Sequence, residues 1–333
     1  MFIIQSYPMA VFFCFITMLC WGSWANTQKL VSKSWHPQLF YWDYTIGLVL
    51  IALILGLTLG SFGDHGRSFI SDLSQASNSS LRFAFIGGVI FNISNLLMVA
   101  AIDIAGMAVA FPIAVGIALV LGVIVNYLAD SSSDPMLLFS GVGLVVVAII
   151  LSAISYSKLP NQGFKATHKG LIVSISAGLI MGFFYRFVAD SISADFANPE
   201  IGKMTSYSAV FIFSIGIFIS NFLWNTYFMY RPIKGYPATY KDYFTKGNFK
   251  LHLVGVLGGI IWNIGMSFSL IASAQAGTTI SYGLGQGATM IGVAWGVFIW
   301  KEFKTAPKGT DLILAAMFGC FIMGLILVIA ARA

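Results

Sequence analysis

The stretch GGVIFNISNLLMVAAIDIAGMAVAFPIAVG, residues 87–116, decides the fold because a second part of the chain repeats it. The second copy is GGIIWNIGMSFSLIASAQAGTTISYGLGQG, residues 258–287. Laid on it without gaps, the first copy is identical at Gly87, Gly88, Ile90, Asn92, Ile93, Ala101, Ala105, Gly106 and Gly116. Each copy holds a long apolar segment, an Ala-Gly break and the start of another segment. The repeated unit is therefore a pair of membrane helices within a larger half, which is typical of transporters.

The composition indicates that the solvent of this chain is lipid. Of its 333 residues, 58% are hydrophobic and only 9% are charged, too few to cover a water-soluble surface. Each apolar run is near the roughly 20 residues that cross a bilayer core. The runs lack the alternation of barrel strands, so the sequence predicts an all-α polytopic membrane protein with ten transmembrane helices. The predicted spans are 6–27, 38–60, 81–102, 106–128, 135–157, 168–188, 204–226, 250–272, 278–300 and 308–331.

The basic residues report orientation and do not indicate nucleic-acid binding. The formal charge is +6, and thirteen of the eighteen Lys and Arg residues fall in the odd-numbered loops of the predicted topology. The positive-inside tendency then places both termini outside the cytoplasm, in an inner or plasma membrane. The stretch 1–26 has no Lys or Arg before its apolar run, so it is interpreted as the first span and not as a secretion signal.

The polar stretch 157–169 divides the ten spans into two five-helix repeats, 1–157 and 158–333. Because each half crosses the membrane an odd number of times, the second copy enters inverted relative to the first. Two such halves can alternate access to a site between them. Gly87, Gly88, Gly258 and Gly259 would allow close helix approach, while Pro112, Gly283, Gly285 and Gly287 would loosen the fourth and ninth spans. Ordinary glycine packing is the alternative.

The sequence carries no signature of an enzyme or of a cofactor site. The breaks expected at residues 103–105 and 273–277, and the longest loop at 227–249, are too short for a catalytic domain. The three cysteines lie in apolar segments, and His36, His65, His168 and His252 lie in loops or at span edges without metal-ligand spacing. We expect neither a cofactor nor a metal.

Asp43 is the acidic residue placed clearly inside a predicted span, which makes it the candidate proton carrier. Partial burial favours the neutral form of a carboxyl group and would bring protonation within reach. Lys29 or Lys33, on the same side of the membrane, could instead hold the group ionised. The alternative is an interfacial aspartate that caps or anchors the second helix.

The motif Trp21-Gly22-Ser23-Trp24-Ala25-Asn26 ends the first predicted helix with two indoles and an amide. Aromatic faces stack on a planar heterocycle or on the apolar face of a sugar, and an Asn side chain supplies both a donor and an acceptor. We expect Trp21, Trp24 and Asn26 to contact a solute or to form a gate. An interfacial aromatic belt would explain the indoles but not Asn26.

Asn92 and Asn263 occupy matching repeat positions near the middle of their helices, where an amide without a partner would be costly. We expect them to face each other, water or a solute, and interhelical hydrogen bonds are the alternative. Further candidate solute contacts are Asn95, Trp262, Tyr282 and Gln286, the last two because they are one helical turn apart.

Three residues are candidate parts of a gate: Pro112, Tyr185 and Arg186. Arg186 can pair with Asp190, four residues on, whereas a direct pair with Asp43 is not expected because the two lie at opposite depths. Snorkelling of the arginine to the membrane interface is the alternative.

The ten spans, the duplicated halves and two motifs together resemble the drug/metabolite transporter superfamily. The motifs are Trp21-Gly22-Ser23-Trp24 and Tyr41-Trp42-Asp43-Tyr44-Thr45. Among its members the chain looks most like the ureide permeases, with residues 73–75 and 126–130 adding to the likeness, and the glucose/ribose porters are the next most similar group. The resemblance implies a secondary transporter for allantoin-like ureides, nucleobases or sugars, commonly linked to protons. Trp24 and Asn26 depart from the pattern expected of plant ureide permeases.

We therefore expect proton-coupled uptake of a small neutral polar solute by alternating access. An uncoupled facilitative carrier is the main alternative, and a channel or membrane enzyme would need a charged filter or a convergent catalytic set that the sequence lacks. The expected partners are the solute, protons and the bilayer, and the sequence leaves a homodimer open.

Overall fold

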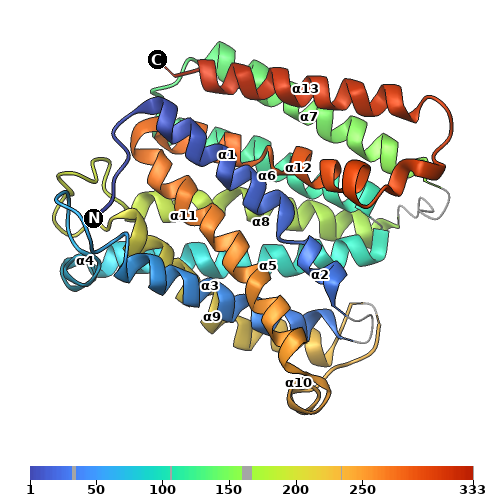
Figure 1. Ribbon diagram of the computed structural model, residues 1–333, viewed down its shortest axis with the longest axis horizontal. Helices are drawn as coiled ribbons and strands as arrows, with labels where there is room; N and C mark the ends of the chain where they lie inside the picture. The colour runs from blue at the N-terminus through green and yellow to red at the C-terminus, as the bar shows by residue number, and fades with distance from the viewer. Residues whose placement is uncertain (32–34, 106, 160–166, 234, 333) are drawn as a thin grey trace. The chain divides into compact units, whose positions relative to one another are not determined.

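The computed structural model describes residues 1–31, 35–105, 107–159, 167–233 and 235–332, and in these ranges the chain is helical (Figure 1). Lys33, Gly106 and residues 160–166 of the expected midpoint lie outside the described residues. The elements are α1 Tyr7–Ser23, α2 Asn26–Leu30, α3 Pro37–Leu57, α4 Phe69–Gln75, α5 Asn78–Ala105, α6 Met107–Ala129, α7 Pro135–Ser157, α8 His168–Ser191, α9 Ser206–Tyr230, α10 Tyr240–Lys246, α11 Phe249–Gly285, α12 Ala288–Ala294, the π-helix η1 Trp295–Ile299, the 3₁₀-helix η2 Glu302–Thr305 and α13 Thr310–Ala330.

The long helices have the length and apolarity of membrane spans. Within the described ranges, nine stretches meet both criteria, and one of them, Phe249–Ile299, runs for 51 residues. Many outward side chains are large and apolar, such as Leu312 at 76% exposure and Ile322 at 51% on α13. Such surfaces are stable against lipid and not against water, so the protein is an integral membrane protein.

The prediction of two loops inside the repeated stretch is wrong, because both segments are largely helical. Residues 103–105 form the last turn of α5, and residues 273–276 continue α11. In α11 the non-helical backbone is confined to Gly277, with φ 76° and ψ 155°. A left-handed φ costs glycine little, so one residue suffices to break the helix. The short helices α4 and α10 were not predicted either.

The described helices form two compact units, and each unit combines two separate parts of the chain. The first contains Met1–Asn92 and Phe184–Gln275, and the second contains Ile93–Phe183 and Ala276–Ala333. The boundaries fall inside α5, α8 and α11. Each unit therefore draws helices from both halves of the sequence.

In the first unit, α3 lies against α9 (Figure 1), and two glycine-mediated crossings have the same design. At the crossing of α3 and α11, a Cβ on Gly259 would lie 2.0 Å from the Tyr44 carbonyl oxygen. At the crossing of α9 and α5, a Cβ on Gly88 would lie 2.1 Å from the Phe213 carbonyl oxygen. Gly88 and Gly259 are matching positions of the repeat, so the expectation that these glycines permit close helix approach is confirmed.

A second pair of contacts extends the correspondence between the two crossings. A Cβ on Gly47 would lie 2.1 Å from the Val256 carbonyl oxygen, and one on Gly216 would lie 2.3 Å from that of Phe85. Aligning Gly47 with Gly216 matches YWDYTIGL, residues 41–48, to VFIFSIGI, residues 210–217. The α3/α11 crossing and the α9/α5 crossing therefore have glycines at matching positions, and these glycines make equivalent contacts.

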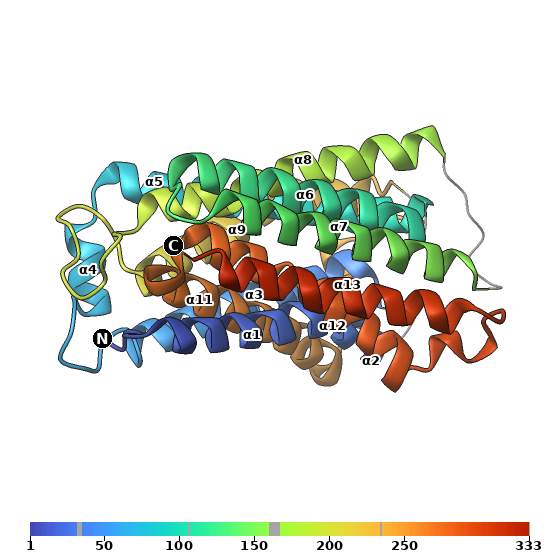
Figure 2. The same ribbon diagram turned by 90° about the horizontal axis from the view of Figure 1, so that it is seen from above.

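In the second unit, α7 and α13 lie side by side in both views (Figure 2). Gly141 and Gly324 bring the two backbones together, because a Cβ on Gly324 would lie 2.8 Å from the Gly141 carbonyl oxygen. Between Gly285, where α11 ends, and Ala288, where α12 begins, the chain makes a turn, as the glycine-rich sequence predicts. By contrast, α6 continues as a helix through Pro112.

Candidate functional site

Two predicted solute contacts, Trp21 and Trp262, lie in an aromatic cluster of the first unit. Their rings stack with centroids 5.6 Å apart, and Trp21 Nε1 donates to the Trp262 carbonyl oxygen at 3.1 Å. Gly265 makes room for the indole, since a Cβ there would lie 2.7 Å from Trp21. Phe91 lies 4.4 Å from Trp262, centroid to centroid, and Phe213 lies 6.1 Å from it. The indoles expected to receive a solute therefore stack on other rings of the protein.

Asn92 and Asn263 are fully buried, and their amide groups are used in equivalent ways. Asn92 Nδ2 donates to the Ile217 carbonyl oxygen at 3.2 Å and to Ser220 Oγ at 2.9 Å. Asn263 Nδ2 donates to the Leu48 carbonyl oxygen at 2.6 Å and to Ser214 Oγ at 3.0 Å. Both amides thus form interhelical hydrogen bonds, which was the alternative interpretation. Each buried Oδ1 has no hydrogen-bond partner among the described residues.

The polar face of α9 was missed by the sequence reasoning. Besides Ser214 and Ser220, it buries Asn221, whose Nδ2 lies 3.4 Å from Thr45 Oγ1, and Asn225, whose Nδ2 donates to the Gln38 carbonyl oxygen at 2.9 Å. These polar residues lie on a helix that is otherwise mostly apolar. Their spacing along α9 was the signal that could have identified a polar helix face.

The remaining residues of the first-helix motif serve local structure. The ring of Trp24 lies 4.9 Å from that of Tyr44, and Asn26 Nδ2 donates to the Ser23 carbonyl oxygen at 3.1 Å. Asn26 belongs to the short helix α2 and is half-buried. The structure therefore separates Asn26 from the end of α1, where the sequence had placed it.

Asn95, Tyr282, Gln286 and Pro112 belong to the second unit. Asn95 and Tyr282 are buried, and Tyr282 donates its hydroxyl to the Ala118 carbonyl oxygen at 2.9 Å. Gln286 directly follows the last residue of α11, and its backbone N–H still donates to the Tyr282 carbonyl oxygen at 3.2 Å, so the two residues are one helical turn apart as expected. The helix ends one residue earlier at Gly285, in the glycine-rich sequence.

The candidate gate residues of α8 differ in exposure. Tyr185 is fully buried, and its hydroxyl lies 3.0 Å from Ser269 Oγ on α11. Arg186 pairs with Asp190 as expected, with Nε donating to Oδ2 at 3.1 Å, and both side chains are partly exposed, at 24% and 34%. The arginine therefore forms a local ion pair on its own helix.

Asp43 lies in the second turn of α3 and is buried, with its side chain 1% exposed. His252 Nδ1, at the start of α11, lies 2.9 Å from Oδ1 and 3.1 Å from Oδ2 of Asp43. Tyr243 of α10 donates its hydroxyl to Oδ1. We call these three residues the Asp43 cluster. The expectation that Lys29 would hold the carboxylate gains no support, because the partners of Asp43 are an imidazole and a phenol.

The local backbone makes space for the Asp43 cluster. A Cβ on Gly255 would lie 2.4 Å from the Asp43 Cβ, and a Cβ on Gly247 would lie 2.2 Å from His252 Nε2. Burial, followed by the hydrogen bond to Asp43 and its negative charge, raises the pKa of Tyr243. The phenol therefore stays protonated and remains a donor at neutral pH. The N-cap of α3 is His36, so Asp43 does not cap the helix.

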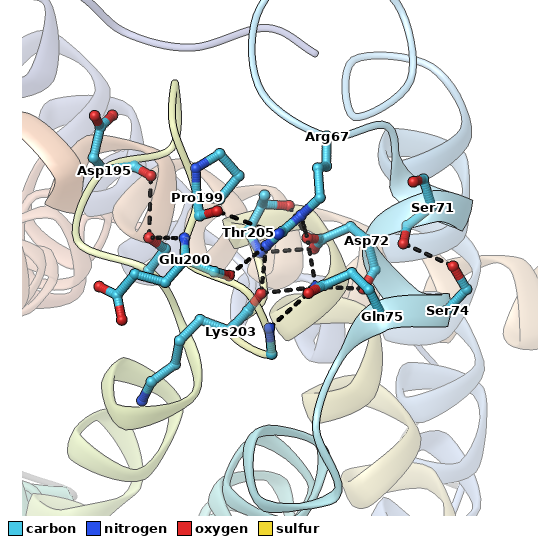
Figure 3. A network of polar contacts seen from close by, with 12 residues as sticks. Arg67, Ser71, Asp72, Ser74, Gln75, Asp195, Pro199, Glu200, Lys203 and Thr205 are labelled. Atoms are coloured by element: carbon cyan, nitrogen blue, oxygen red, sulfur yellow. Dashed lines mark hydrogen bonds and ion pairs between the residues drawn. The ribbon is translucent and has the colours of Figure 1, made fainter.

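A second buried carboxylate, Asp72, lies in α4 beyond the other end of α3. Its Oδ1 accepts from Arg67 Nε at 3.0 Å, and its Oδ2 accepts from Thr205 N at 2.7 Å and Thr205 Oγ1 at 3.0 Å (Figure 3). Arg67 also donates to the carbonyl oxygens of Pro199, Glu200 and Lys203, at 3.2, 2.9 and 2.7 Å respectively. We call this set the Asp72 cluster.

The described ranges contain no group of three or more His, Cys, Asp or Glu residues placed to hold a metal ion. A pocket of about 210 Å³ opens beside Gln5, His65, Asp195 and Gln275. Gln5 Nε2 lies 3.4 Å from His65 Nε2 at this exposed position. The Asp43 cluster, the Asp72 cluster and the buried amides all combine burial with polar side chains in the first unit.

Comparison with known proteins identifies the family. The family model described as ureide permease matches residues 40–168 and 163–331. Ureide permease 1 of Arabidopsis thaliana is 26% identical over 99% of both chains, and ureide permease 2 of the same plant is 24% identical over 99% of both. A protein of Streptococcus agalactiae named "Putative sugar uptake protein" is 21% identical over 94% of this chain and 95% of its own.

A solved structure, described only as the crystal structure of a protein, has the same fold. It covers 98% of this chain and 99% of its own, with a TM-score of 0.60 and 14% identity. The plant relatives are named as permeases and not as enzymes. The chain, with its apolar helices and its match to the family model over most of its length, belongs to the ureide permease family of membrane transporters.

Proposed function

We propose that this protein couples the uptake of a small neutral polar solute to protons, with Asp43 as the proton carrier. The observation that carries the proposal is a buried carboxylate whose hydrogen-bond partners are an imidazole, His252, and a phenol that donates to it, Tyr243. An ionisable group inside a membrane span is costly unless it has a function or a fixed partner. Among the residues that the structure describes, Asp43 has no arginine or lysine partner that would keep it permanently ionised.

The proposed topology is ten crossings in two inverted five-helix repeats, 1–157 and 158–333. A continuous helix of 51 residues would be about 76 Å long, more than twice the roughly 30 Å hydrocarbon core. The break at Gly277 therefore supports two crossings within Phe249–Ile299. The two matches to the family model meet at residues 163–168, near the proposed midpoint. The equivalent glycine crossings of the first unit support the duplication.

We propose that the solute contacts Trp21 and Trp262 by stacking and the Asn92 and Asn263 carbonyl oxygens by hydrogen bonding. Each of these amides stands next to an aromatic residue of its helix, Phe91 or Trp262. The two buried Oδ1 atoms are acceptors, which suit a solute rich in N–H donors. Aromatic faces suit a planar ring. Trp24, Asn26, Asn95, Tyr282 and Gln286 remain proposed contacts, and Pro112, Tyr185 and Arg186 remain proposed gate residues.

The names of the relatives favour a ureide as the solute. Allantoin and uracil both present planar N–H and C=O groups, which match the stacking and acceptor chemistry of this set. The streptococcal relative, named for sugar uptake, favours a monosaccharide as the second candidate. A thermal-shift screen of the purified protein with allantoin, uracil and glucose separates them, because a bound solute stabilises the folded state.

We further propose an inner or plasma membrane location with both termini outside the cytoplasm, supported by the distribution of Lys and Arg. Labelling of cysteines introduced at either terminus tests this orientation. A homodimer is the proposed alternative to a monomer, and light scattering of the detergent-solubilised protein distinguishes them.

The decisive test is Asp43→Asn in proteoliposomes loaded to give a pH gradient. We expect the variant to lose gradient-driven accumulation of the solute and to keep exchange of labelled for unlabelled solute at equal pH. Asp311→Asn, at an exposed acid in the first turn of α13, is the matched control and should behave as wild type. Full accumulation by Asp43→Asn would reject coupling through this residue and favour an uncoupled carrier.

A further inference from the structure

The residues of the Asp43 cluster differ in solvent exposure, and the histidine is more exposed than the carboxylate. The Asp43 side chain is 1% exposed, whereas that of His252 is 29% exposed. The carboxylate itself has almost no access to solvent, so a proton needs an intermediate group to reach it. His252 contacts both oxygens of Asp43 and is also accessible.

The two ring nitrogens of His252 face different surroundings. Nδ1 faces the Asp43 carboxylate, while Nε2 lies on the side of Gly247, which offers no side chain to cover it. Trp35 meets the imidazole edge to face with centroids 5.3 Å apart, and Tyr243 lies 4.6 Å from it. The aromatic rings hold the imidazole in place, and position 247 has room for Nε2 because a glycine stands there, while the side chain as a whole is 29% exposed.

We propose that His252 is the proton relay of Asp43, carrying protons between the buried carboxylate and the aqueous face on which α10 lies, with Tyr243 as a positioning residue. This inference deepens the proposed function and rests on it, because a relay matters only if Asp43 carries a transported proton. In this relay, His252 determines from which side of the membrane a proton reaches Asp43.

The proton transfer is balanced without a further reactant. A proton from water binds Nε2, the Nδ1–H bond breaks as an O–H bond forms on Asp43, and the imidazole is left neutral with its proton on Nε2. The neutral imidazole then presents the Nδ1 lone pair, which can accept a hydrogen bond from the protonated carboxyl group. The reverse sequence passes a proton from Asp43 to the same aqueous face, so His252 serves the exchange of Asp43 with that face alone, and exchange with the opposite face does not pass through the imidazole. Tyr243 donates to Oδ1 in the ionised state and holds the carboxylate towards the ring.

The charged side chains near His252 on α10 and α11 pair with each other or face solvent. On α10, Asp242 and Lys246 pair with each other at 2.7 Å, and Lys241 is exposed. On α11, Lys250 is exposed as well. From the segment before α3, Trp35 carries no titratable group. Within the described ranges, the titratable groups that contact the imidazole are therefore Asp43 and Tyr243.

The equivalent crossing in the same unit lacks both members of the pair. Asp43 precedes Gly47 by four residues, and Ile212 stands in the same place before Gly216. His252 precedes Val256 by four residues, and Leu81 stands in the same place before Phe85. A proton can thus be relayed at the α3/α11 crossing and not at the α9/α5 crossing. Two otherwise matching crossings differ at the positions that the relay requires.

The test measures two kinds of transport in proteoliposomes with radiolabelled allantoin and, in parallel, radiolabelled glucose. His252→Gln keeps a hydrogen-bond donor beside Asp43 but cannot carry a proton. We expect gradient-driven accumulation to fall by about a hundredfold, the size of a lost acid–base group. Exchange at equal pH should stay within a factor of two of wild type. His168→Gln, at the exposed start of α8, is the control and should change neither.

The outcomes separate the relay from the coupling that it serves. If Asp43→Asn loses accumulation while His252→Gln keeps it with an unchanged pH profile, the relay is refuted and the proposed function stands. If Asp43→Asn keeps accumulation, the proposed function itself fails. Loss of exchange as well as accumulation in His252→Gln would assign the histidine a structural role and would also overturn the relay.

A spectroscopic measurement tests the relay without transport. A difference infrared titration of wild-type protein should show a carboxylic acid band that is absent from Asp43→Asn. With His168→Gln, which leaves the Asp43 cluster intact, the band should persist and return at the wild-type rate after a pH jump. With His252→Gln the band should appear about a hundredfold more slowly, as expected for a lost proton-transfer group. Equal rates in wild type and His252→Gln would overturn the proposal.

Discussion

The Asp72 and Asp43 clusters occupy corresponding places in the first unit, yet their carboxylates have different kinds of partner. α4 follows α3 and contacts the start of α9, and α10 follows α9 and contacts the start of α3. Asp72 and Tyr243 are each the fourth residue of a seven-residue helix. In one cluster the carboxylate is on the short helix, and in the other it is on the span. The same architecture therefore supports two different chemistries.

The difference lies in whether the partner charge can change. The partners of Asp72 are a guanidinium group, which is a permanent cation in proteins, and a backbone N–H, which has no second charge state. The partner of Asp43 is an imidazole, the type of side chain that can change its charge in the physiological range. The Asp72 cluster therefore joins the loops around it through a permanent ion pair, whereas the Asp43 cluster has the kind of partner that the proposed proton coupling requires.

The largest effect should follow from Asp72→Ala, which leaves Arg67 without its carboxylate and Thr205 without its acceptor. Breaking a buried ion pair from one side costs about 3 to 5 kcal/mol. We expect unfolding of the detergent-solubilised protein to shift accordingly. Glu200→Ala is the control, because Arg67 contacts its carbonyl oxygen and its side chain is exposed. Equal stability of the two variants would show that the Asp72 cluster does not hold the loops.

The equivalence of the two glycine crossings can be broken by Gly88→Ala and Gly259→Ala. Each new Cβ would approach a carbonyl oxygen within about 2 Å, so the helices must separate. Overpacking of this kind costs about 1 to 3 kcal/mol, and we expect similar losses for both variants in a denaturation series. Gly319→Ala in α13, where a Cβ meets nothing within 4 Å, should not be destabilised. A loss at one crossing alone would contradict their equivalence.

Tyr243→Phe should shift the pH dependence of transport without abolishing it. The phenol donates a hydrogen bond to ionised Asp43, so its removal favours the protonated carboxyl group. A hydrogen bond to a charged group contributes about 1.5 kcal/mol, which corresponds to roughly one pH unit. We expect the pH of half-maximal accumulation to move upward by that amount. Tyr236→Phe, at an exposed position of the same loop, should leave it unchanged, and a downward shift for Tyr243→Phe would contradict the assigned role.

Asp242→Asn should produce the smallest effect, and one that is independent of pH in the working range. The hydrogen bond from Lys246, followed by those from Thr239, lowers the pKa of Asp242 to about 2. Because this pKa lies below that of the unfolded chain, the stabilisation is complete above about pH 5 and is lost only as the pH falls towards 2. Thermal unfolding of wild type and variant should therefore differ by a constant amount between about pH 5 and pH 8. A difference that grows across this range would assign the pH response to α10.

Much of the fold could be predicted from local sequence. The apolar runs gave the spans because lipid requires about 20 apolar residues in a helix. The repeated Gly-Gly and Asn positions predicted close packing and buried amides, and the structure has Gly88, Gly259, Asn92 and Asn263 in those roles. The ion pair between Arg186 and Asp190 could also be predicted, because the two residues are four positions apart on one helix. The sequence predicted a loop at residues 273–277, whereas in the structure the single residue Gly277 interrupts the helix α11.

What the sequence determined by itself was the membrane-spanning helical class, the repeated stretch and the placement of Asp43 as an acid inside a span, because each depends on residues close together or on hydropathy. What only the tertiary structure decided was the partner of that acid. His252 and Tyr243 lie about two hundred residues away along the chain, and no local pattern connects them to α3. Hydrogen bonding between distant helices depends on how the backbones cross, and those crossings are fixed by packing in three dimensions.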